Sequence, residues 1–236
     1  KDAFFVRYDD RFRLGFSHIS DEPFRFRLGL ASSDDLSDIV VDEVIDDGDV
    51  GGLASPTVVS DPAGGFVMTY NSHTTDVGGA APKLYFRRSD DLVTWSAGAR
   101  IVIDGADADD DRLIDAAIAF ADAGAFLVFK REQTATIAHA PSGRPEGPWT
   151  LLGEVTPSNL ENGQLLQIDG VWHLLGTTLP IDHRAVLHRL SGDERDPQAW
   201  RHFDVVGELV VPAEDWNTGT YPSFERSNAA SLLDLR

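Results

Sequence analysis

Apolar residues along this chain come in short runs, separated by turns rich in Asp and Gly. Two apolar runs joined by such a turn are typical of a β-hairpin. The hairpin occurs four times, and its copies begin at Phe4, Thr57, Ala116 and Gln164. No stretch has the sustained periodicity of an amphipathic helix. The pattern therefore predicts an all-β chain built from a repeated unit.

A second pair of apolar segments follows each hairpin. It is clearest at 28–36 and 84–95, where Ser-Asp-Asp-Leu recurs, and weaker at 136–149 and 186–200. Each repeat thus supplies about four strands, and repeats at intervals of about 50 to 60 residues are near the period of propeller blades. The alternative is a β-sandwich, which has no two-part unit recurring at this period.

The repeat predicts a five-bladed β-propeller of four-stranded antiparallel blades. Four blades are complete in the sequence, and the segment from Asn228 to Leu235 resembles the beginning of a fifth, so that the last blade is incomplete. We expect residues 1–236 to form a single domain of this type.

The charge balance narrows the classes of partner. Lys and Arg total 20 against 39 Asp and Glu, a net charge of −19, which disfavours nucleic acid and anionic membranes and favours a neutral or cationic ligand. There is no cysteine, which excludes disulfides and thiolate chemistry. No apolar run is long enough to span a bilayer. We expect a soluble protein, cytoplasmic or secreted, of undetermined oligomeric state.

Carboxylates stand just before three of the four hairpins: Asp2, Asp115 and Glu161. A propeller brings the starts of its first strands to one end of a central channel, so these residues should converge. Cleavage of a glycosidic bond needs one carboxyl group as a proton donor and another, ionised, to activate water or attack the sugar. Against this, a chain with 39 acidic residues can place carboxylates at strand starts by chance, and Asp also stabilises turns.

These segments resemble glycoside hydrolase family 43 and, more distantly, family 32, over nearly the whole chain. Asp2 before Ala3 is similar to the family's first Asp-Pro strand start. Ile114 and Asp115 are similar to its Ile-Asp-Pro segment, and Glu161 to its glutamate ahead of an Asp-Gly hairpin. The segment 89–95 resembles the family's recurring Ser-x-Asp-Leu-x-x-Trp.

The resemblance implies a glycosidase without an organic cofactor, acting on saccharides with arabinofuranosyl or xylosyl units. Asp2 would be the general base, Asp115 would modulate the acid's pKa and orient substrate, and Glu161 would be the general acid of an inverting hydrolase. Two alternatives stay open: a retaining, fructofuranosidase-like enzyme and a non-catalytic carbohydrate-binding propeller. Ala3, Ala116 and Gly163 depart from the family pattern, which usually has proline there.

Four further residues are candidates for substrate binding. Lys130 ends a third-blade strand, where it could meet sugar hydroxyls, although a strand-end lysine is often simply solvated. Trp216 and Tyr221 could stack on a sugar ring or pack in the core. His73 ends an inner strand, although a lone histidine is more often structural. The recurring Trp95, Trp149 and Trp200 (a separate set, at the ends of outer-strand units) are expected to pack between blades.

The segment 104–111 contains five aspartates and could hold a structural calcium ion through carboxylate and carbonyl oxygens. It lacks the glycine and glutamate positions of an EF-hand loop. A solvated loop is the competing interpretation, and the sequence predicts no other metal site.

Overall fold

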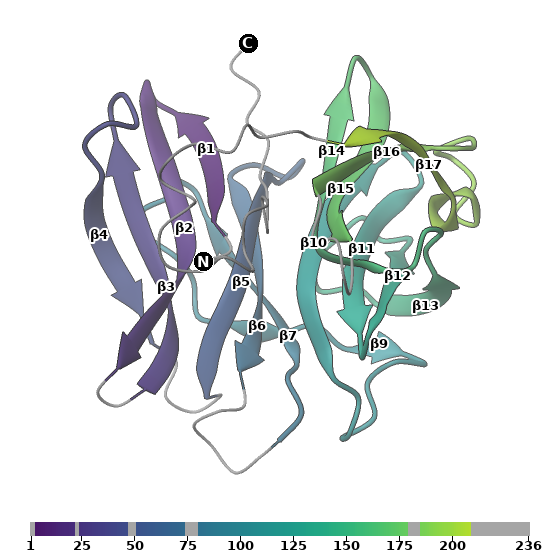
Figure 1. The fold of residues 1–236 in the computed structure, drawn as a ribbon, viewed down its shortest axis with the longest axis horizontal. Coiled ribbons are helices and arrows are strands. Elements are labelled where there is room, and N and C mark those ends of the chain that lie inside the picture. The colour runs from purple at the N-terminus through teal and green to yellow at the C-terminus, as the bar shows by residue number, and fades with distance from the viewer. Residues whose placement is uncertain (1–2, 22–23, 47–50, 74–79, 179–184, 209–236) are drawn as a thin grey trace.

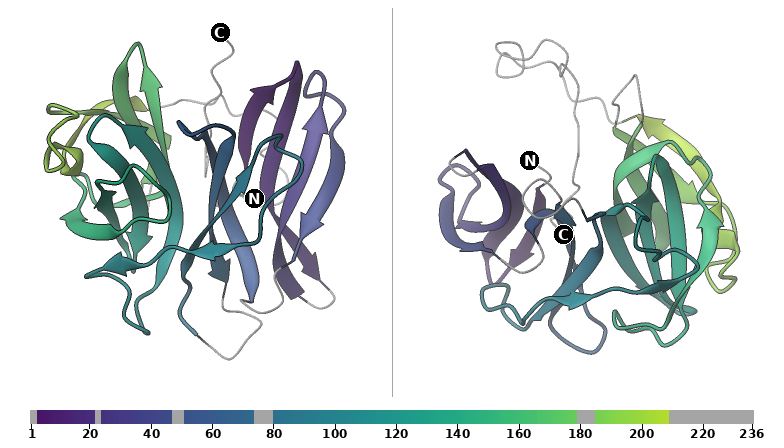
Figure 2. Two further views of the ribbon diagram at one scale, coloured as in Figure 1. Left: turned by 180° about the vertical axis from the view of Figure 1, so that it is seen from behind. Right: turned by 90° about the horizontal axis from the view of Figure 1, so that it is seen from below.

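A computed structural model describes residues 3–21, 24–46, 51–73, 80–178 and 185–208. These residues form four antiparallel sheets that follow one another along the chain (Figure 1). In the right-hand view of Figure 2 the sheets lie side by side along an arc, as blades of a propeller do. The fold is therefore an all-β propeller with four-stranded blades.

Each blade is a meander whose strands pair in chain order. Blade 1 contains β1 (Phe4–Tyr8), β2 (Arg11–Asp21), β3 (Phe24–Ser33) and β4 (Val40–Ile45). Blade 2 contains β5 (Gly52–Ser60), β6 (Phe66–His73), β7 (Leu84–Ser89) and β8 (Ala99–Arg100). Blade 3 contains β10 (Leu113–Ala121), β11 (Gly124–Arg131), β12 (Thr134–Ala140) and β13 (Trp149–Glu154), and β9 (Ile103–Asp104) pairs in parallel with β13. Blade 4 contains β14 (Leu160–Ile168), β15 (Val171–Thr178), β16 (Ala185–Leu190) and β17 (Phe203–Glu208), with a short 3-10 helix, η1 (Ala199–Arg201), before β17.

The predicted hairpins are confirmed, but the predicted number of blades is not. The described residues form four blades rather than five. The fifth-blade prediction depended on Asn228 to Leu235, which lie outside the described residues. A short apolar segment with no hairpin after it lacks the repeated unit on which the other blades were predicted.

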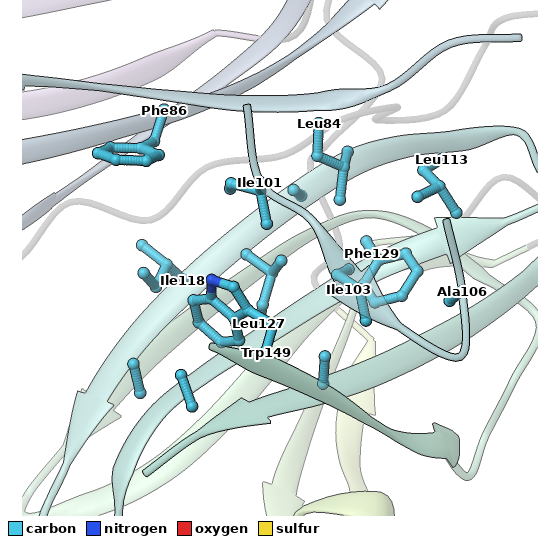
Figure 3. Packing of buried hydrophobic residues seen from close by; sticks show 14 of the residues in the cluster. Leu84, Phe86, Ile101, Ile103, Ala106, Leu113, Ile118, Leu127, Phe129 and Trp149 are labelled. Atoms are coloured by element: carbon cyan, nitrogen blue, oxygen red, sulfur yellow. The ribbon is translucent and has the colours of Figure 1, made fainter. Parts of the chain in front are cut away.

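The hydrophobic core lies between successive blades. One cluster joins blades 2 and 3 around Phe86, Ile118, Phe129 and Trp149 (Figure 3). Similar clusters join blade 3 to blade 4 and blade 1 to blade 2. Because the blades pack face to face, the first strands β5, β10 and β14 are brought next to one another.

The recurring tryptophans belong to these interfaces, as predicted. Trp149 is 1% exposed and donates from Nε1 to the Pro145 carbonyl, 2.9 Å away. Trp200 is fully buried and stacks on Phe126 with ring centroids 3.9 Å apart. Trp95 packs against the cluster between blades 1 and 2. None of the described residues forms a helix long and apolar enough to cross a membrane.

Candidate functional site

A β-bulge interrupts the first strand of blades 2, 3 and 4 at the same place. The register with the second strand breaks between Ala54 and Thr57, between Ile114 and Ala117, and between Glu161 and Gln164. In each case two residues face one residue of the partner strand, which bends the strand and redirects a side chain. The strand continues through the bulge, so the candidate residues lie inside strands rather than before them.

The first residue of each bulge has a left-handed backbone. Ser55, Asp115 and Asn162 have φ angles of 54°, 57° and 50°. Asn and Asp enter this conformation more readily than most residues because their short polar side chains can bond locally. Pro56 follows Ser55, and a bulge is one of the few places in a sheet where proline fits.

The three bulges line one pocket, whose cavity volume is about 50 Å³. Blade 1 contributes its first described residues, Ala3, Phe4 and Phe5. The other blades contribute the bulge residues and those that follow them: Ser55–Val59, then Asp115, Ala117 and Ile118, then Asn162–Leu165. The pocket thus draws on the first strand of all four blades. Of the carboxylates that were predicted to converge, Asp115 lines it, whereas Glu161 and its neighbour Lys130 do not.

Asp115 is the buried carboxylate of this pocket, with 8% of the residue exposed. Its Oδ1 accepts a hydrogen bond from the Ser55 hydroxyl at 2.7 Å. Its backbone N–H donates to the Asn71 side-chain oxygen at 3.1 Å, and the Ser55 N–H donates to the Ser17 hydroxyl at 2.9 Å. Two hydrogen bonds with blade 2 therefore fix Asp115 before any ligand arrives, and Ser17 of blade 1 in turn holds Ser55.

Glu161 stands immediately before the blade-4 bulge and forms an ion pair with Lys130. The distance from Lys130 Nζ to Glu161 Oε2 is 2.8 Å, and the two side chains are 8% and 17% exposed. Lys130 lies on β11 directly opposite Ile114, the neighbour of Asp115. The ion pair therefore ties Glu161 of blade 4 to the second strand of blade 3.

The other predicted site residues have different outcomes. His73 ends β6 and stacks on Phe26, with ring centroids 4.1 Å apart, and it does not line the Asp115 pocket. Asp2, Trp216 and Tyr221 lie outside the described residues. Ala3, which follows Asp2 in the chain, does line the pocket.

Sequence reasoning missed Ser55, Asn71 and Asn162. Ser55 and Asn162 each stand two residues before the first residue paired beyond the bulge, just as Asp115 does, but this correspondence is visible only in the strand register. Counted from the hairpin starts at 57, 116 and 164, the three residues are two, one and two positions ahead, so the repeats alone indicate it only approximately. Asn71 had no such signal, because its role depends on the contact between blades 2 and 3.

The acidic segment 104–111 is organised by basic side chains. Lys83 is 8% exposed, and its ammonium group donates to the carbonyls of Ala108 and Asp111 and lies 3.5 Å from Asp107 Oδ1. Arg131 binds Asp111 at 2.8 Å. Within the described ranges no three His, Asp or Glu side chains are grouped to hold a metal ion.

Asp111 shows the electrostatic balance in this segment. Burial by itself would raise the pKa of its carboxyl group, but the hydrogen bonds from Arg131 and from the Ala108 N–H outweigh it. Together with the charges of Arg131 and Lys83, they leave the pKa below the usual 3.8. The Lys83 ammonium group lies among carbonyl and carboxylate oxygens of segment 104–111. These are the oxygen types that were expected to bind calcium.

Comparison with models of protein families and with the sequences of curated proteins finds no match to the chain. Solved structures do match. A thermostable family-43 glycoside hydrolase aligns over 88% of this chain and 75% of its own, at a TM-score of 0.63 and 15% identity. A candidate glycoside hydrolase from Parabacteroides distasonis aligns over 98% and 79%, at a TM-score of 0.68 and 16% identity.

A third match is an exo-β-1,3-galactanase from Phanerochaete chrysosporium, solved with β-1,3-galactotriose. It has a TM-score of 0.60 and 12% identity, and the alignment covers 88% of this chain but 49% of the galactanase. At such low identities the matches establish the fold. The resemblance to family 43 seen in the sequence is thus confirmed at the level of the propeller.

Proposed function

We propose that this protein is a glycoside hydrolase whose active site is the pocket at the three bulges. The observation that carries the proposal is Asp115: a buried carboxylate in a left-handed bulge, fixed by Ser55 and Asn71 at the mouth of a pocket. The family-43 fold of the matching structures supports the same assignment.

The proposed reaction uses three carboxyl groups. Glu161, as general acid, gives its proton to the glycosidic oxygen while the bond from that oxygen to the anomeric carbon breaks. Asp2, as general base, takes a proton from the water that forms the new bond to the anomeric carbon, with inversion. Asp115 orients the sugar and disfavours a second negative charge nearby. An acid must carry its proton when the bond breaks, so binding of the sugar must displace Lys130 from Glu161.

The substrate class is a neutral saccharide. The pocket combines apolar side chains such as Phe4 and Phe5 with a few polar groups, which is the usual composition of a small-molecule site. Arabinofuranosyl and xylosyl units remain our first candidates, and the galactanase among the matching structures adds β-galactosides.

The test is release of aryl aglycone from α-arabinofuranosides, β-xylosides and β-galactosides by the parent protein and by Glu161→Gln. We expect turnover on one class and a loss of at least about a hundredfold in the variant, smallest on substrates with good leaving groups, since general acid catalysis contributes that much. Glu154→Gln, at an exposed position at the end of β13, is the matched control and should retain activity. A variant Glu161→Gln as active as the parent would remove the proposed acid.

The Lys130–Glu161 ion pair favours a second candidate, a propeller that binds sugar without cleaving it. A carboxylate tied to a buried ammonium group is arranged to accept hydrogen bonds from hydroxyls rather than to donate a proton. Sugar binding detected by calorimetry in a parent protein that turns over no glycoside would select this candidate.

A further inference from the structure

The three bulges do not contribute equally to the pocket. The side chains of Ser55 and Asp115 are hydrogen-bonded to each other, at 2.7 Å, and this bond fixes the Asp115 carboxylate. Asn162 holds the same bulge position in blade 4, with the same left-handed backbone, and also lines the pocket. Its carboxamide makes no hydrogen bond to another residue of the described part of the chain.

A half-buried carboxamide in this position is a binding group that has no hydrogen-bond partner among the described residues. It offers two N–H donors and one carbonyl acceptor. Polar groups that lose contact with water on ligand binding must be satisfied by the ligand, or binding is penalised. A sugar hydroxyl both donates and accepts, so a pair of neighbouring hydroxyls matches the two ends of the carboxamide.

The backbone alone does not require asparagine at this point. Glycine adopts a left-handed conformation at no steric cost, so glycine at position 162 would keep the bulge. Asn162 lines the same pocket as Asp115, so a hydroxyl that it binds lies in the proposed active site.

We propose that Asn162 is a specificity-determining residue that binds hydroxyl groups of the sugar next to the bond that is cleaved. The inference rests on the proposed function of the same pocket. In this proposal Asn162 of blade 4 distinguishes sugars by the positions of their hydroxyl groups. Asp115 and Glu161 take part in the bond cleavage, which is the same for all substrates.

The experiment compares the parent with Asn162→Gly, which removes the carboxamide and keeps the backbone conformation. Both are assayed on the best aryl glycoside and on its monodeoxy analogues. We expect about a tenfold lower kcat/KM for the variant on the full sugar, the equivalent of one hydrogen bond. We also expect the parent to discriminate against one deoxy analogue, and the variant to lose that discrimination.

Asp169→Gly is the matched control. Asp169 also has a left-handed backbone, with φ of 51°, but stands in the turn at the opposite end of β14. It should leave both kcat/KM and the discrimination unchanged. A variant Asn162→Gly that discriminates among the deoxy sugars as the parent does would overturn the inference, because a purely structural effect lowers the rate on all of them alike.

Failure of the proposed function has a different signature. If the parent turns over no glycoside, binding of arabinose, xylose and galactose is measured by calorimetry for the parent and for Asn162→Gly. Weaker binding by the variant supports the role of Asn162 in a non-catalytic site, and equal binding overturns it. A parent that neither cleaves nor binds any of these sugars overturns both proposals.

Discussion

Lys130 and Glu161 form a largely buried ion pair. Its contribution to the stability of the fold can be measured separately from its role in catalysis. Removing water from two charges is costly, and the cost is recovered only while both partners are present. With side chains 8% and 17% exposed, neither partner can regain full hydration when the other is removed. Loss of one partner should therefore cost more than loss of both.

We predict that Lys130→Met lowers the free energy of unfolding by about 3 kcal/mol, and that adding Glu161→Met restores part of it. Urea denaturation of the two single variants and the double variant measures the coupling, which should be about 1 to 3 kcal/mol. The control is the exposed pair of Arg195 and Asp122, with side chains 74% and 68% exposed. Arg195→Met should change stability by less than about 1 kcal/mol. Additive effects at Lys130 and Glu161 would contradict a buried pair.

At the scale of elements, the recurring Ser-Asp-Asp-Leu segment is a self-capped turn. In blade 2 the Ser89 hydroxyl accepts hydrogen bonds from the N–H groups of Asp91 and Leu92, at 3.2 and 2.8 Å. Asp91 Oδ1 then accepts from Val93 and Thr94, at 2.8 and 2.7 Å. Ser33 makes the same contacts in blade 1, to Asp35 and Leu36. The motif recurs because the third strand of each of these blades must end in the same tight turn.

Ser89→Ala should therefore destabilise the protein by about 1 to 2 kcal/mol, since Ser89 is 5% exposed and its loss leaves two backbone N–H groups without their acceptor. Thermal or urea denaturation measures the change. Ser191→Ala, at an exposed position, should stay within about 0.5 kcal/mol of the parent. Equal stability of Ser89→Ala and the parent would show that water replaces the hydroxyl.

The hairpins and these turns could be predicted because each is determined by residues close in sequence. Asp169 and Gly170 specify their turn whatever the rest of the chain does. The bulges could not be predicted in this way, because a bulge is defined by the partner strand. The carboxylates were therefore expected before the strands, whereas Asp115 and Glu161 lie within β10 and β14.

Contacts between blades set a second limit on prediction. The Lys130–Glu161 pair joins blade 3 to blade 4, and the contact of Asn71 with Asp115 joins blade 2 to blade 3. The sequence identified Lys130, Asp115 and Glu161 as candidates, but it contained no information on which side chains would meet. Lys130 was expected to meet sugar hydroxyls, and the structure gives it Glu161 as a partner.

At the scale of the whole molecule, the net charge of −19 opposes the compact state through self-repulsion. Salt shortens the Debye length from about 30 Å at 0.01 M to about 8 Å at 0.15 M, so it weakens repulsion between distant carboxylates more than it weakens close ion pairs. The melting temperature should therefore rise with NaCl over this range. The same acidity offers many weak positions for divalent cations, which makes a calcium effect easy to misread.

We predict that CaCl2 gives no saturating rise in melting temperature beyond that of NaCl at equal ionic strength, because Lys83 already binds the carbonyls of Ala108 and Asp111 inside the acidic loop. A cation that bound only the folded state would raise the melting temperature further. The rise would increase with the ratio of the cation concentration to the dissociation constant of the site. Lys83→Met provides the counterpart: it removes the internal ammonium group, and calcium should then stabilise the variant more than NaCl does. A calcium-specific rise that saturates in the parent would contradict this prediction and would support the interpretation of segment 104–111 as a calcium site.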